Sequence, residues 1–116
     1  MKFVALFTVI PDKDEERAIA VAKEAGAGAT TIIHGRNIGL TEKKVFFGLT
    51  LEENVSILVF ILPRKLSMQV MKALRDEFDL DSHKNSSLAF TMPLSHVAGL
   101  NNDELHQFEQ DIKHIL

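Results

Sequence analysis

FVALFTVI, residues 3–10, is a nearly unbroken apolar run that is rich in β-branched and aromatic residues. Such a run is typical of a strand that is buried on both faces of a sheet. A second run of the same kind, VSILVFIL, occupies residues 55–62 and ends at Pro63. The two runs predict two central strands, and the remaining elements are arranged around them.

A helix and a weaker strand follow the first run. Small apolar residues recur at helical spacing over residues 18–25, and Gly26 supplies the C-terminal stop. Asp12 is the expected N-cap, with Glu15 three residues on as its capping-box partner. Residues 29–33, ATTII, are shorter and more polar than the first run, so we expect an edge strand there.

A helix and a short strand also follow the second apolar run. An apolar stripe over residues 66–78 predicts a second helix, and residues 88–92 before Pro93 predict a short edge strand, because proline cannot extend the ladder. A last apolar stripe predicts a C-terminal helix over residues 102–116.

This order predicts an α+β fold, the ferredoxin-like β-α-β-β-α-β sandwich with an additional C-terminal helix, in a single domain over residues 1–116. Two helices cover only one face of a four-stranded sheet, yet both central strands are apolar on both faces. The second face would be a large exposed apolar patch on a monomer. Either the C-terminal helix or other subunits must cover it, and we expect subunits in a closed ring.

Residues 35–50 form a long connection between two predicted strands. Most of them are polar or glycine, so they cannot build a core. Connections of this length in a compact domain are usually functional or disordered. We therefore expect an arm that contacts a ligand, a partner protein or both.

Composition excludes several classes of function. The 116 residues carry a formal charge of −3 with acidic and basic residues interspersed, whereas nucleic-acid binding needs a concentrated basic face. There is no cysteine, so disulfides and thiolate sites are absent. No apolar run approaches the about 18 residues that span a membrane, and residues 1–10 lack the cleavage site of a signal peptide. We expect a cytoplasmic protein that is not inserted in a membrane.

Several features resemble the P-II-type signal-transduction family. They are the junction HGRN at residues 34–37, the long connection that follows, the strand that ends at Pro63, and FTMP at residues 90–93. The resemblance covers roughly residues 2–95 in element order and spacing. The passage EKKVFFGLTLEEN, residues 42–54, looks closer still to a divergent P-II-like branch that is linked with membrane proteins.

The resemblance implies a homotrimer that binds adenine nucleotides, ATP or ADP, in clefts between neighbouring subunits. It implies a nitrogen-regulatory type of regulator and not an enzyme. The long loop would change shape with the ligand and dock onto a target protein, most plausibly a membrane transporter. Gly35, Arg36 and Asn37 fall where the family has Gly-Arg-Gln at the entrance of the loop, beside the nucleotide.

The chain also departs from the family pattern. The family's phosphate-holding turn is Gly-Asp-Gly-Lys, whose glycines let backbone N–H groups close around phosphate and whose lysine supplies the charge. Here Asn85, Ser86 and Ser87 stand in its place, with Lys84 nearby as a substitute. The family's two later arginines and its loop tyrosine are absent as well. These departures put the familiar mode of ATP binding in question and exclude uridylylation of a loop tyrosine.

For the other candidate site residues, both a functional and a structural interpretation remain open. Arg36, Lys43 and Lys44 bind an anionic ligand or an acidic partner surface, or such residues simply keep the loop soluble. Of Phe46 and Phe47, at least one is expected in the core, and the other is a candidate for partner docking. Ser86 and Ser87 donate to a ligand or are ordinary turn residues.

The five histidines do not predict a metal site, because no pair has the spacing of a convincing ligand set. His34 and His83 are the two that can converge in a subunit cleft. A second hypothesis is a trimeric metal-ion-handling protein of the same fold, which needs the histidines or acidic residues to converge. A third is an oligomeric scaffold without a ligand, since fold alone does not choose among these functions.

Overall fold

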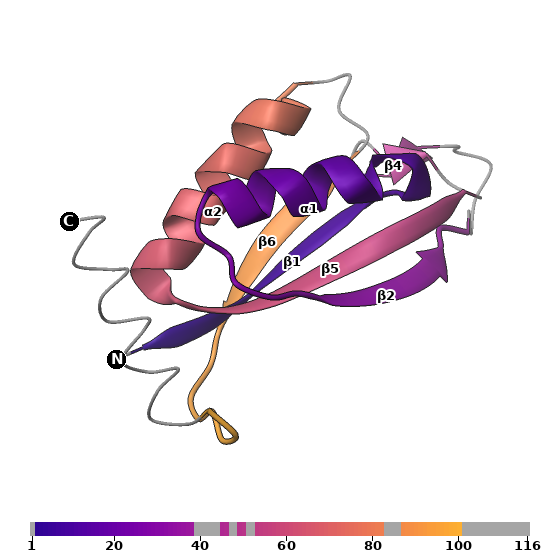
Figure 1. The fold of residues 1–116 in the computed structure, drawn as a ribbon. Coiled ribbons are helices and arrows are strands. Elements are labelled where there is room, and N and C mark those ends of the chain that lie inside the picture. The colour runs from indigo at the N-terminus through magenta and orange to yellow at the C-terminus, as the bar shows by residue number, and fades with distance from the viewer. Residues whose placement is uncertain (1, 39–44, 47–48, 51–52, 83–86, 101–116) are drawn as a thin grey trace.

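A four-stranded antiparallel sheet covered on one side by two helices makes up most of the computed structural model, which describes residues 2–38, 45–46, 49–50, 53–82 and 87–100 (Figure 1). The order of the strands in the sheet is β2-β5-β1-β6. The elements are β1 (Phe3–Pro11), η1 (Asp12–Asp14), α1 (Glu15–Glu24), β2 (Thr31–Arg36), β3 (Val45–Phe46), β4 (Leu49–Thr50), β5 (Asn54–Pro63), α2 (Arg64–Phe78) and β6 (Leu88–Pro93).

The two apolar runs are the central strands, as predicted. β1 pairs with β5 along its whole length, and β2 and β6 occupy the two edges. This confirms the α+β ferredoxin-like arrangement. The predicted C-terminal helix lies outside the described residues.

The hydrophobic core lies between the sheet and the helices. Even-numbered residues of the central strands, such as Leu6 and its cross-strand partner Phe60, face the helices and are buried. α2 contributes Leu66, Val70 and Leu74, while α1 contributes small alanines that let it lie close to the sheet. The alternation of side chains along a strand places the odd-numbered residues on the opposite face.

That opposite face is apolar, and no helix of the described part of the chain lies over it. Ile33, Ile61, Phe90 and Met92 are exposed on it, and the Phe7 and Phe90 rings stack with their centroids 5.1 Å apart. We call these exposed and half-buried residues the open face: Phe7, Val9, Ile33, Ile57, Val59, Ile61, Leu88, Phe90 and Met92. The predicted excess of apolar surface on this side of the sheet is therefore present.

The start of the first helix differs from the prediction. Asp12 begins a 3-10 turn, α1 starts at Glu15, and no side-chain cap hydrogen bond is made at either start. The carboxylates of Asp12 and Glu15 instead lie within hydrogen-bond distance of the Ser56 hydroxyl of β5. A tertiary partner has replaced the capping box.

The predicted strand and loop around residue 35 also differ. β2 continues through Gly35 and Arg36, so the connection starts two residues later than expected, and within it β3 pairs with β4 in a short hairpin. Pairing with β5 supplies the ladder that the polar sequence of β2 does not suggest. No helix in the described part of the chain is long and apolar enough to cross a membrane.

Replacing Gly26 by alanine should lower the free energy of unfolding by about 1–3 kcal/mol. Gly26 has φ of +118°, and a Cβ there would lie 2.9 Å from Leu66 Cδ1 in the core. Gly28→Ala is the matched control, because its Cβ would meet nothing within 4 Å. Urea unfolding of the two variants measures the difference, and equal losses would contradict the strain at Gly26.

Candidate functional site

The C-terminal end of β2 is where the candidate site begins. Gly35 pairs with Val55 and Arg36 with Asn54, and the Asn37 amide donates to the Glu53 carbonyl oxygen at 2.9 Å. These contacts bring the two ends of the connection between β2 and β5 together. We call residues 35–37 and 53–55 the neck.

Of the three neck residues that are predicted to bind a ligand, Gly35 and Arg36 lie on opposite faces of the sheet. Gly35 lies on the open face, where an added Cβ would be in ordinary contact with Val55 and Ile57 at 3.8 and 3.9 Å. Arg36 is exposed on the helix side and makes no ion pair with the described residues. The neck therefore offers a guanidinium on the helix side of the sheet and an apolar surface on the open face.

A polar cluster of four side chains lies next to the neck, on the helix side of β2 and β5. Ser56 Oγ is buried and lies 2.8 Å from Asp12 Oδ1 and 2.7 Å from Glu15 Oε1. His34 Nε2 lies 2.7 Å from the same Glu15 oxygen. The register places His34 directly opposite Ser56, so the two side chains approach Glu15 from neighbouring strands.

The cluster changes the acid–base behaviour of two groups. The hydrogen bond with Glu15, and then its negative charge, raise the pKa of His34 above its ordinary value of 6.5. The hydrogen bonds from Ser56 and from His34 lower the pKa of the Glu15 carboxyl below 4.5. Between these two pKa values the pair is an ion pair.

Sequence reasoning missed this cluster. It assigned Asp12 and Glu15 to a helix cap and treated His34 as an isolated histidine or as a metal ligand with His83. His83 lies outside the described residues, so the convergence of the two histidines stays a prediction. Among the residues that are described, no group of three or more His, Cys, Asp or Glu could hold a metal ion.

Most of the other candidate site residues also lie outside the described residues. They are Lys43, Lys44, Phe47, Lys84, Asn85 and Ser86. Phe46 belongs to β3, where it pairs with Leu49. Ser87 is buried just before β6. Only Ser87 of the predicted phosphate turn is therefore described, and the convergence of this turn with the neck stays a prediction.

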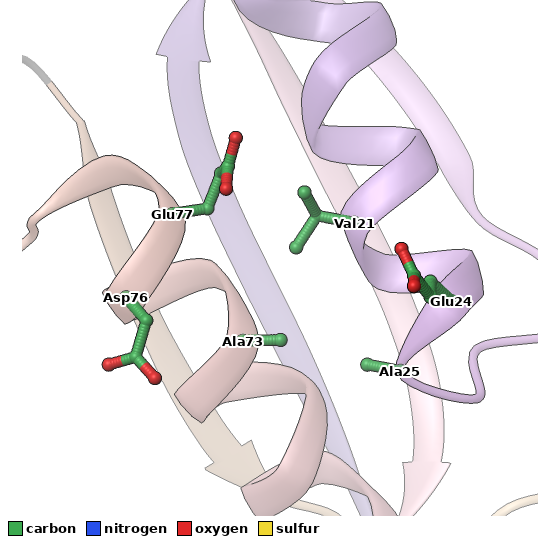
Figure 2. Close-up of a pocket in the computed structure, with 6 residues that line it drawn as sticks. All are labelled: Val21, Glu24, Ala25, Ala73, Asp76 and Glu77. Atoms are coloured by element: carbon green, nitrogen blue, oxygen red, sulfur yellow. The ribbon is translucent and has the colours of Figure 1, made fainter.

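A groove of about 350 Å³ lies elsewhere, between the two helices. Figure 2 shows Ala25 and Ala73 pointing toward each other across it, with the carboxylates of Glu24, Asp76 and Glu77 around them. Glu77 also pairs with Arg17 at 3.4 Å. Carboxylates repel phosphate groups, so this groove does not suit a nucleotide.

Comparison by sequence with protein-family models and with curated proteins finds no match. Comparison of the structure with solved structures does find similar chains. A PII-like signalling protein from Thermus thermophilus, TTHA0516, superposes with a TM-score of 0.59 at 17% identity, over 81% of this chain and 87% of that one. CPII from Thiomonas intermedia, a nitrogen regulatory PII-like protein bound to ADP, AMP and bicarbonate, gives 0.63 at 12% identity, over 86% and 98%.

The chain has the PII-like fold. The resemblance found in the sequence is thereby confirmed at the level of the fold. CutA1 from Pyrococcus horikoshii is similar as well, with a TM-score of 0.65 at 14% identity over 93% of this chain and 96% of that one. The neck lies at one end of the sheet, where β2 ends and β5 begins.

Proposed function

We propose that this protein is a PII-like signal-transduction regulator, not an enzyme, that works as a homotrimer in the cytoplasm. A small effector binds in the clefts between its subunits. The observation that carries this proposal is the open face. A neighbour that covers this apolar surface would also lie against Gly35, because Gly35 is on the same side of the sheet as Val55 and Ile57.

The effector that we propose first is an adenine nucleotide, ATP or ADP. CPII shares the fold, and its structure contains bound ADP and AMP. Arg36 at the neck would contact the phosphate groups, since a guanidinium pairs well with phosphate oxygens. Gly35, Asn37 and the turn formed by Lys84, Asn85, Ser86 and Ser87 complete the proposed ligand contacts.

The partner that we propose is a target protein, with a membrane transporter as the leading candidate. The connection between β2 and β5 would carry the contact, through Lys43, Lys44, Phe46 and Phe47. A ligand at the neck would bias this connection between free and docked states, because its two ends meet there.

Native mass spectrometry with and without ATP and ADP tests the proposed assembly and ligand together. We expect a trimer that takes up nucleotide, with no more than one nucleotide for each cleft. A trimer that binds neither ATP nor ADP would overturn the proposed ligand. A monomer at every concentration would overturn the proposed assembly.

Changing Arg36 to alanine should weaken nucleotide binding by about tenfold or more, because a charge-assisted hydrogen bond to phosphate is lost. Arg75→Ala is the matched control. Arg75 is exposed on α2, and its 3.8 Å contact with Asp81 is a surface pair that contributes little. Isothermal titration calorimetry measures both affinities, and equal affinities in the two variants would place the site elsewhere.

A metal-ion-handling protein of the same fold is the second candidate. The similarity to CutA1 is compatible with it. This function needs ligands that converge between subunits, of which His34 is described and His83 is not. A titration with Cu²⁺ and Zn²⁺ that shows no binding would remove this candidate.

A further inference from the structure

The neck end of β2 is held less firmly than a central strand. β2 is an edge strand that pairs with β5 alone in the described sheet. His34 adds a side-chain contact from β2 to the layer of helices, through its 2.7 Å approach to Glu15. The residues that follow it, Gly35, Arg36 and Asn37, are those that we propose to contact the ligand.

The two halves of this contact differ in exposure and in the partners that hold them. Glu15 is the first residue of α1, its side chain is 24% exposed, and the buried Ser56 hydroxyl holds the carboxylate in place. The N-terminus of a helix also favours a negative charge. His34 is 67% exposed on an edge strand. Glu15 is therefore the fixed half, and His34 is the half that can leave.

Protonation of His34 strengthens this contact in a second way. The Ser56 hydroxyl carries one hydrogen, yet it lies within hydrogen-bond distance of both Asp12 and Glu15. When imidazolium donates to Glu15, the Ser56 hydrogen is free to satisfy Asp12. When His34 is neutral, its positive charge is lost, and only the tautomer that carries the hydrogen on Nε2 still donates to Glu15. In the other tautomer, the two carboxylates compete for the Ser56 hydrogen.

We propose that the His34–Glu15 contact is a proton-controlled latch, which holds the neck end of β2 against α1 when His34 is protonated and loosens it when His34 is neutral. The latch adds a form of regulation to the proposed function. Only its effect on ligand binding at the neck rests on that function. It gives the regulator a second input, the proton, at the residues that bind the effector.

The charged groups around His34 fix the direction of the effect. Glu15 from α1 and Asp12 from η1 favour the protonated imidazole, and both act to raise its pKa. Partial desolvation of the ring acts in the opposite direction and lowers the pKa of His34. Arg36 is the other charged residue on this face of β2, two residues along the strand. Because the pKa of His34 is raised, the latch is fully closed below its ordinary pKa of 6.5 and opens as the pH rises through the higher value in the folded protein. Acid opens it too, but only when Glu15 is protonated, below pH 4.5.

Two NMR measurements on the full chain without ligand test the latch. The first follows the ring signals of His34 with pH, and we expect a pKa above 6.5 that falls toward 6.5 in Glu15→Gln. The second follows hydrogen exchange of the Asn37 amide, corrected for its intrinsic rate, at about pH 6 and about pH 8. We expect a several-fold loss of protection at the higher pH.

Two variants separate the latch from a general effect of pH. His34→Gln should remove the pH dependence of Asn37 protection, whereas His96→Gln, at an exposed histidine outside the cluster, should keep it. A His34 pKa at or below 6.5, or the same loss of protection in His34→Gln as in the original chain, would overturn the proposal. No nucleotide is used in these measurements, so a failure of the latch is distinguishable from a failure of nucleotide binding.

Discussion

Replacing Phe60 by alanine should lower the free energy of unfolding by about 3–5 kcal/mol, because a large side chain is removed from a packed core. Phe60 is 2% exposed in the middle of β5, opposite Leu6 of β1. It faces α1 and α2, whose buried residues belong to the same cluster. Alanine leaves a cavity that these elements cannot fill without moving. Urea unfolding followed by circular dichroism measures the loss.

Phe90→Ala is the matched control for this prediction. Phe90 is 40% exposed on the open face and stacks on Phe7. In dilute solution its removal should cost only about 1 kcal/mol, the typical value of an aromatic pair. A Phe60 variant that loses no more stability than the Phe90 variant would contradict the assignment of the two faces. At higher concentration the Phe90 loss should grow, because assembly then stabilises the original chain.

The arrangement of the strands could be predicted because its signal is local. In residues 3–10 and 55–62 both alternating sets of positions are apolar, and only a strand in the middle of a sheet buries both. β1 and β5 are indeed central. The bounds of β2 were harder to predict, because Gly35 and Arg36 have weak strand preference and are held in the strand by pairing with β5.

The polar cluster could not be predicted because it depends on contacts between distant residues. Asp12 and Glu15 have the spacing of a helix cap, which is the local interpretation. The residue within hydrogen-bond distance of both carboxylates is Ser56, which is 44 residues from Asp12 and 41 residues from Glu15 in sequence. Only the register of β2 on β5 brings His34 beside it. Without that register, no pattern in the sequence links a serine within an apolar strand to these residues.

Changing Ile61 to glutamate should dissociate the proposed trimer. Ile61 is 40% exposed on the open face, where it pairs with Ala5 of β1. In a closed ring the same glutamate recurs in every subunit, and burying each unpaired charge costs several kcal/mol. Size-exclusion chromatography with light scattering measures the mass. An Ile61→Glu protein that keeps the mass of the original oligomer would show that another surface forms the assembly.

Met68→Glu is the matched control for assembly. Met68 is 64% exposed on α2, on the helix side of the molecule, so a charge there should leave the mass unchanged. The variants at Phe60 and Ile61, neighbouring positions of β5, then distinguish an effect on folding from an effect on assembly. The Phe60 variant should lose stability even as a monomer, because its side chain is buried within the subunit. The Ile61 variant should lose only the part of the stability that depends on protein concentration, because its side chain is exposed until a neighbour covers it.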